Sequence, residues 1–177
     1  DACPVRLPGP EKFNEKLCFF KILFYNKNMM RTVSTQEIED CVYRLARRAG
    51  LTLTDACRNA LKEAERCEQG AAKFALTTVL KNEQCAQKEK MPVCQDTGMS
   101  VVFLELGQDV HLTGKPLRIA VDEGVRRAYA DGNFRKSICD PLTRENTGDN
   151  TPAHLHTELV EGDEIKITFS APEFLIA

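Results

Sequence analysis

The sequence lacks the features that mark a membrane-spanning or nucleic-acid-binding protein. Its 177 residues contain no apolar run near the roughly 20 residues that a transmembrane helix needs. With 24 Lys and Arg against 26 Asp and Glu, the formal net charge is -2. That balance predicts no binding to nucleic acid or to an anionic membrane. A hydrophobic share of 42% and a charged share of 28% are typical of a soluble globular domain with one core.

Two cysteine patterns are also missing. None of the eight cysteines has a partner at the Cys-x-x-Cys spacing of a zinc ribbon, and no secretory signal precedes them. A structural zinc site is therefore disfavoured. Four cysteines fall in helical, Ala- and Leu-rich sequence, and we expect them to be small buried hydrophobic residues in a reducing compartment: Cys41, Cys57, Cys67 and Cys85. The corresponding prediction is a cytoplasmic location.

The first 28 residues differ in character from the rest. The apolar segment 17–25 is short, is interrupted by Lys21 and is not followed by a small-residue cleavage site. Met29 and Met30 stand directly before the first clear helix signal. We therefore interpret residues 1–28 as a non-native or disordered leader, with a buried strand as the alternative.

Three helices are predicted between residues 34 and 88. The segment from Ser34 to Glu37 has the pattern of a capping box, and apolar residues follow it at helical spacing as far as Gly50. A second helix is expected from Thr54 and a third over residues 71–88. These helices have no obvious chemical role.

The remainder predicts strands around one further helix. Residues 100–106 read as a buried strand and 110–112 as a short return strand, followed by a helix over 117–129. Residues 153–160 and 164–170 are expected to form a hairpin. The fold class is therefore α+β, with an N-terminal helical region followed by a mixed or antiparallel sheet that has a C-terminal hairpin.

The most chemically informative segment lies just before the buried strand. Met91-Pro92-Val93-Cys94-Gln95-Asp96-Thr97-Gly98 places a thiol, an amide, a carboxylate and a hydroxyl side by side. A turn held between a helix and a strand exposes backbone N–H groups beside such side chains, and sites are commonly built there. Taken alone, Cys94 is more often a buried thiol, and Asp96-Thr97-Gly98 is more often a capped turn.

This segment resembles the N-terminal signature of the iron–sulfur hydro-lyases, the class I fumarases and the alpha subunit of L-tartrate dehydratase. Three later segments are similar to the same family in the same order: Asp122 to Tyr129, Phe134 to Ser137, and Asn146 to Ala153. The resemblance covers roughly residues 30–172.

The resemblance implies reversible hydration of fumarate to malate, with tartrate dehydration as the alternative. It also implies a 4Fe-4S cluster held by three cysteines, with one iron open to a small dicarboxylic acid. Cys94 is then a cluster ligand, Gln95 a hydrogen-bond donor to the substrate, and Asp96 the candidate acid and base. Arg135 binds a substrate carboxylate through its planar fork. Without the resemblance, Arg135 and Lys136 would be a solvated surface pair.

The sequence departs from the family pattern after Pro172. The family's alpha domain continues into a glycine-rich loop and two more cluster cysteines, which this chain lacks. We therefore expect residues 29–172 to be the N-terminal part of that domain and 173–177 to be a non-family tail. The remaining cluster ligands are expected outside this chain. The implied partners are a beta subunit or C-terminal domain, in a homo- or hetero-oligomer. Alone, the chain is expected to be inactive, and a non-catalytic remnant that acts as an interaction module is the alternative.

The histidines present one further option. His154 and His156 lie two apart on one face of a predicted strand, and with Cys139 they could indicate a transition-metal site. A half-exposed sheet face is the favoured interpretation. His111 has no evident partner in the sequence.

Overall fold

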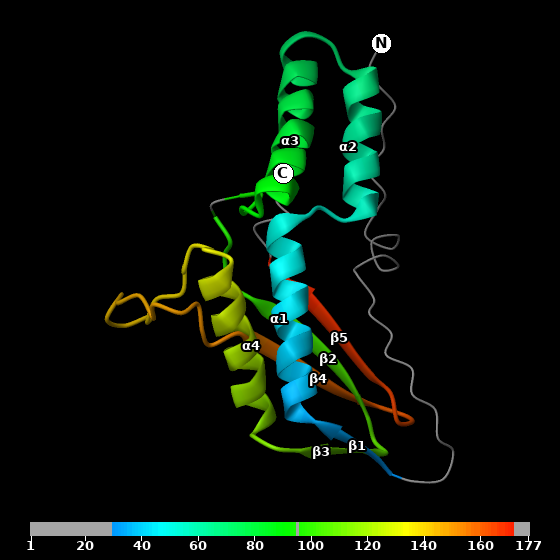
Figure 1. Ribbon diagram of the computed structural model, residues 1–177, viewed down its shortest axis with the longest axis vertical. Helices are drawn as coiled ribbons and strands as arrows, with labels where there is room; N and C mark the ends of the chain where they lie inside the picture. The colour runs from blue at the N-terminus through cyan, green and yellow to red at the C-terminus, as the bar shows by residue number, and fades with distance from the viewer. Residues whose placement is uncertain (1–29, 95, 172–177) are drawn as a thin grey trace. The chain divides into compact units, whose positions relative to one another are not determined.

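The computed structural model describes residues 30–94 and 96–171 (Figure 1). Within this part the chain forms two compact units, one of residues 51–93 and one of residues 30–50 with 94–171. The predicted leader, Gln95 and the predicted tail lie outside the described residues. None of the described helices is both long and apolar enough to cross a membrane.

The first unit is a pair of helices, α2 (Asp55–Cys67) and α3 (Gly70–Glu89), and both match the sequence prediction. Thr54 caps α2, because its Oγ1 accepts a hydrogen bond from the Cys57 N–H at 3.2 Å. Lys90 ends α3 in the left-handed conformation, with φ 55°.

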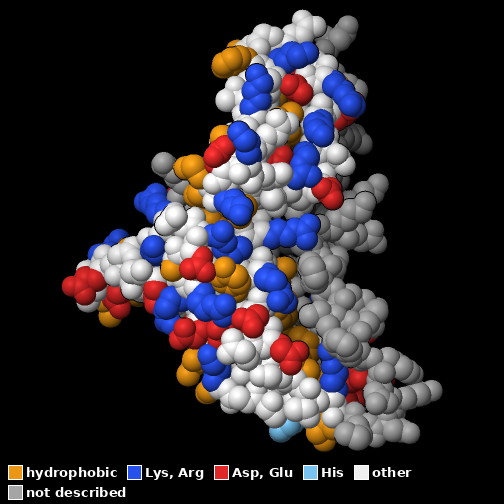
Figure 2. All heavy atoms as spheres, viewed as in Figure 1, with side chains coloured by type: hydrophobic (Ala, Val, Ile, Leu, Met, Phe, Trp, Pro, Cys, Tyr) orange, Lys and Arg blue, Asp and Glu red, His pale blue; other side chains and the backbone are white. Residues whose placement is uncertain are grey.

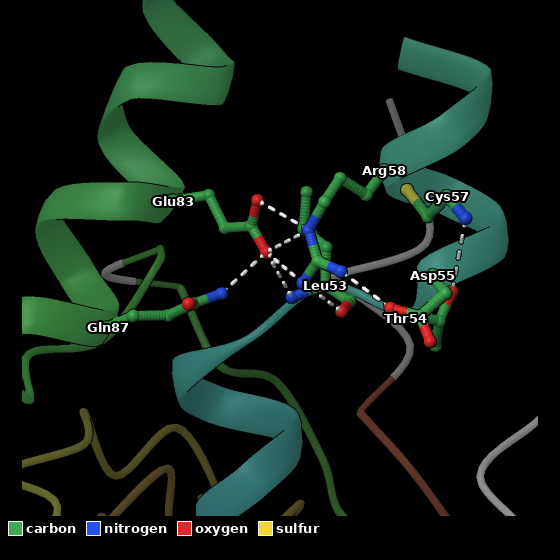
Figure 3. Close-up of polar contacts among 7 residues, drawn as sticks. All are labelled: Leu53, Thr54, Asp55, Cys57, Arg58, Glu83 and Gln87. Carbon is green, nitrogen blue, oxygen red and sulfur yellow. Dashed lines mark hydrogen bonds and ion pairs between the residues drawn. The ribbon is translucent and has the colours of Figure 1, made fainter. Parts of the chain in front are cut away.

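A buried carboxylate joins the two helices (Figure 3). The Glu83 side chain is 3% exposed and accepts hydrogen bonds from Arg58 at 2.5 Å and from Gln87 at 2.8 Å. The N–H of Leu53 donates to the same carboxylate, and Arg58 also reaches Asp55 at 2.6 Å. The hydrogen bonds from Arg58 hold the pKa of Glu83 below its ordinary value despite burial. The carboxylate therefore stays ionised and orders the contact between α2 and α3.

Apolar surface on this helix pair remains exposed (Figure 2). Phe74 is 75% exposed, and α2 contains no buried residue. A two-helix unit can bury only the stripe between its helices. The prediction that Cys57, Cys67 and Cys85 are buried is wrong for that reason, since all three are exposed.

The second unit contains two helices and five strands. In chain order they are β1 (Arg31–Ser34), α1 (Thr35–Leu51), β2 (Val101–Gly107), β3 (Val110–Thr113), α4 (Leu117–Asp131), β4 (His154–Val160) and β5 (Ile165–Ser170). Its core is made of apolar residues from α1, α4, β2 and β5: Ile38, Cys41, Val42, Leu45, Val121, Val125, Val102, Leu104, Ile167 and Phe169. The observed α+β class and the mixed sheet confirm the predicted fold class.

The helices α1 and α4 approach closely at Gly124. A Cβ there would lie 2.6 Å from the carbonyl oxygen of Glu39, so the contact requires glycine. The nearly buried Glu39 carboxylate accepts hydrogen bonds from Lys115 and Arg127, each at 2.6 Å. Burial alone would raise the pKa of Glu39, but these hydrogen bonds outweigh it and lower the pKa. Lys115 and Arg127 therefore keep the buried carboxylate charged between the helices.

The central strand of the three-stranded sheet is β2, which pairs in parallel with β4 and antiparallel with β5. The predicted C-terminal hairpin is wrong, because β2 lies between β4 and β5. The turn that joins those two strands closes over the end of β2. The Gly107 N–H donates to Glu164 O at 2.8 Å, and the Asp109 N–H to Gly162 O at 3.0 Å. A Cβ on Gly107 would lie 2.3 Å from Gly162 O, so this wrapping also depends on glycine.

The predicted return strand exists as β3, but it pairs in parallel with β1 instead of with β2. Ser34, at the end of β1, accepts a hydrogen bond from the Gln36 N–H at 3.2 Å and so begins α1. The reciprocal contact from Glu37 is not among the hydrogen bonds of the described residues, so the predicted capping box is confirmed only in its first half.

Candidate functional site

Three separate segments of the chain meet beside the start of β2: residues 96–100, 134–138 and 146–152. Hydrogen bonds connect them directly. Thr97 Oγ1 donates to Arg135 O at 2.6 Å, and Asn150 Nδ2 donates to Gly98 O at 3.1 Å. The Ser137 N–H donates to Asn150 Oδ1 at 2.7 Å. These are the same segments that carry the sequence motifs, so the fold brings the motifs together.

Asp96 and Arg135 face each other at the surface of this cluster. The distance from Asp96 Oδ1 to Arg135 Nη1 is 3.7 Å, and the side chains are 58% and 65% exposed. An ion pair this exposed adds only about 0–1 kcal/mol of stability. The pair therefore does not hold the loops together, and both groups remain open to a ligand.

The backbone beneath this pair is held by buried side chains. Thr97 and Ser100 are fully buried. The Tyr129 hydroxyl, on α4, accepts a hydrogen bond from Ser100 Oγ at 3.2 Å and donates to Thr97 O at 3.3 Å. The ring of Phe134 lies edge-on to Tyr129, with centroids 5.4 Å apart. The loop before β2 is thus held by Tyr129 of α4, and Phe134, the first residue of the next segment, packs against Tyr129.

The third segment is held to α4 by Asp149. Its carboxylate accepts hydrogen bonds from Arg126 Nε at 2.8 Å and from the Thr151 N–H at 2.9 Å. Burial by itself would raise the pKa of Asp149, but Arg126 and Thr151 outweigh it and lower the pKa from 3.8 to about 2. The Ala153 N–H donates to Asp122, also on α4, at 2.9 Å. The segment is therefore held at two points along the helix.

Cys94 is exposed at the entrance to the motif loop. Among residues 30–94 and 96–171, no group of three or more His, Cys, Asp or Glu side chains is placed to hold a metal ion. A 4Fe-4S cluster with three protein ligands needs three thiolates. The described residues alone therefore do not fit a complete cluster, and Cys94 is the thiol that the motif loop offers.

The histidine pair lies on the strand face that the sequence predicted. The rings of His154 and His156 are 4.4 Å apart between centroids, and His156 stacks on Phe103 at 5.2 Å. Both imidazoles are exposed, as expected for a half-exposed sheet face. Cys139 instead belongs to the turn that bridges to Asn146, and within the described chain it does not complete a metal-binding group with them.

The sequence motifs point to Cys94, Asp96 and Arg135 as site residues but indicate no role for Asn150 or Tyr129. Both are almost fully enclosed, at 0% and 2% exposure, and both hold the motif loop. A signal was present for Asn150, a polar residue inside a recognisable motif segment. Its burial could not be inferred from neighbours that are mostly polar.

A family model described as fumarate hydratase (Fumerase) matches residues 39–172. A protein of Methanocaldococcus jannaschii named putative L(+)-tartrate dehydratase subunit alpha is 33% identical over 131 residues, which are 72% of this chain and 46% of the relative. The aerobic class I fumarate hydratase of Escherichia coli is 37% identical over 97 residues, 53% of this chain and 18% of the relative.

Fumarate hydratase 2 of Leishmania major is 29% identical over 171 residues, 94% of this chain and 29% of that protein. The chain therefore spans less than half the length of each of these relatives. The matched region contains all three motif segments that meet beside β2.

Proposed function

This chain belongs to the fumarate hydratase family, and on that premise we propose that it supplies the substrate-binding loops of a hydro-lyase that interconverts fumarate and malate. Residues 29–172 are then the N-terminal part of the alpha domain, which the family match over residues 39–172 supports. The observation that carries the proposal is the Asp96–Arg135 pair, open to solvent and 3.7 Å apart on loops held by buried side chains.

The reaction requires a carboxylate to be held while a proton and a hydroxide are added to, or removed from, neighbouring carbons. The Arg135 guanidinium is planar and permanently charged, so it can bind a substrate carboxylate with two hydrogen bonds. Asp96 lies beside it and is the candidate for moving the proton. Gln95, between Cys94 and Asp96, is proposed as a further hydrogen-bond donor to the substrate.

Cys94 is proposed as one ligand of a 4Fe-4S cluster whose other ligands lie outside the described residues. Thiolates suit iron–sulfur ligation because they are soft and strongly donating. Such a cluster supplies a Lewis-acidic iron when it is bound. The partners follow from the same premise: a small dicarboxylic acid, and a beta subunit or C-terminal domain within a homo- or hetero-oligomer. We also propose a cytoplasmic location, because exposed thiols such as Cys57 and Cys85 persist in a reducing compartment.

L-tartrate dehydration is the second candidate. The relative named as a tartrate dehydratase alpha subunit is matched over 46% of its length, a larger share than for the two fumarate hydratases described above. Malate and tartrate both present two carboxylates and a 2-hydroxyl, so Arg135 would serve either substrate in the same way.

The test is a titration of the purified chain with L-malate and with L-tartrate, followed through the backbone amide NMR signals of residues 96 and 135, which wild type and variant share. We expect saturable shifts that Arg135→Lys weakens about tenfold, because a single ammonium cannot replace the two-pronged contact. Arg144→Lys, at an exposed arginine of the following turn, is the matched control and should change nothing. Equal affinity in wild type and Arg135→Lys would remove Arg135 from the site.

A further inference from the structure

We propose that Asn150 is the positioning residue that sets the spacing between Asp96 and Arg135, and so the fit of the dicarboxylate, a ligand taken from the proposed function above. Asn150 touches neither of those side chains. It acts through the backbone that carries them, and its side chain is fully buried.

One amide group ties two segments together at Asn150. Its Nδ2 donates to Gly98 O at 3.1 Å, on the segment that carries Asp96. Its Oδ1 accepts from the Ser137 N–H at 2.7 Å and from the Ile138 N–H at 3.3 Å, on the segment that carries Arg135. Gly98 follows Asp96 by two residues, and Ser137 follows Arg135 by two, so a shift at either contact is passed to the exposed pair.

Few side chains could replace this asparagine. The contact needs a donor for a carbonyl and an acceptor for two N–H groups in one short planar group. Aspartate offers only acceptors when ionised, and its charge would face the Gly98 carbonyl. The backbone of Asn150 is also left-handed, with φ 62°, a conformation in which asparagine is enriched among non-glycine residues.

The first experiment uses Asn150→Asp in the full chain, with assigned NMR amide signals. At about pH 7 the new carboxylate loses the bond to Gly98 O, so the signals of Asp96 and Arg135 should move from their wild-type positions. At about pH 4 the protonated carboxyl again has a donor and an acceptor, and the signals should return. Wild type, taken through the same pH series, corrects for every other titrating group.

Asn146→Asp is the matched control. Asn146 is an exposed asparagine of the same loop, and its side chain contacts Lys136 O and the Gly148 N–H instead of residues 96–98. Its substitution should leave the Asp96 signal in place at both pH values. An Asp96 signal that stays at its wild-type position in Asn150→Asp at about pH 7 overturns the proposal.

A second measurement covers the case in which Asn150→Asp does not fold. In the wild-type chain, hydrogen exchange at the Ser137 and Ile138 amides should be at least about tenfold slower than at unprotected amides, because Asn150 Oδ1 accepts from both. If the Ser137 and Ile138 amides exchange as fast as unprotected amides, Asn150 does not accept their hydrogen bonds and the proposal is wrong.

The functional readout is the affinity for L-malate. Relative to wild type at the same pH, Asn150→Asp should bind malate about tenfold more weakly at about pH 7 and recover at about pH 4. If Asn150→Asp bound malate weakly because the whole chain was destabilised, acidification would not restore the affinity. If the wild-type chain binds no malate, the proposed function is wrong. The amide signals of Asp96 and Arg135 would still test the role of Asn150 in that case.

Discussion

The hydroxyl of Thr97 donates a hydrogen bond to the carbonyl oxygen of Arg135, 2.6 Å away and 38 residues further along the chain. Thr97 is fully buried, and Arg135 is 65% exposed at its side chain. The contact therefore holds the backbone of an arginine whose guanidinium faces Asp96 at the surface. Together with the hydrogen bonds of Asn150, it fixes the backbone positions of the exposed Asp96–Arg135 pair from inside the fold.

Removing that hydroxyl should destabilise the second unit. Thr97→Val keeps the shape of the side chain but leaves Arg135 O without its buried donor, at a cost of about 1–3 kcal/mol. Thr97→Ser keeps the donor and loses one methyl, at about 1 kcal/mol. Urea unfolding monitored by circular dichroism gives both values. A Val variant as stable as wild type would show that the hydrogen bond contributes nothing.

Glu83 should dominate the stability of the α2–α3 pair. Glu83→Gln removes the buried charge opposite the half-buried Arg58 and should cost about 1–3 kcal/mol, since a buried partner is lost while Asp55 still pairs with Arg58. The matched control is Glu63→Gln, at the exposed pair with Arg66, which should cost less than about 0.5 kcal/mol. Hydrogen exchange within α2 and α3 measures the two effects, and equal effects would contradict the assignment of Glu83 as the central contact.

The lowered pKa of Asp149 predicts that acid destabilises the loop that contains it. Its pKa is lowered to about 2, so its stabilising effect is fully present above its unfolded pKa of about 3.8 and is lost as the pH falls through about 2. The lowering corresponds to about 2 kcal/mol. Arg126→Gln should raise the pKa of Asp149 and move the loss to higher pH, which carboxyl NMR titration would detect. An unchanged titration in that variant would exclude Arg126 as the cause.

The cysteine thiols should differ in their rates of alkylation. Cys41 is buried and burial raises the pKa of its thiol, so alkylation should be at least about tenfold slower than at the exposed Cys94 or Cys139. Mass spectrometry of a timed iodoacetamide reaction gives the three rates in one sample. Equal labelling of Cys41 and Cys139 would show that α1 opens readily from its core.

Sequence patterns were sufficient where the controlling contacts are local. The four described helices were predicted because apolar spacing, a cap such as Thr54 and a stop such as Gly50 act within a few residues of one another. The motif at Cys94 to Gly98 identified the family for the same reason, since a run of adjacent residue types can be recognised without knowledge of what it touches.

Strand order, the exposure of the cysteines and the role of Asn150 depend on contacts between residues that are distant in the sequence. Alternating apolar residues defined β4, β5 and the turn between them, but alternation does not specify a strand's neighbour, and only the assembled sheet places β2 between them. Cys57 and Cys85 are exposed because the described unit pairs only α2 with α3 and buries the stripe between them, and no helical pattern states how many helices pack together. Asn150 became a bridge only when folding brought Gly98 and Ser137 to opposite ends of one amide group, because hydrogen bonds across 52 and 13 residues follow from the tertiary structure alone.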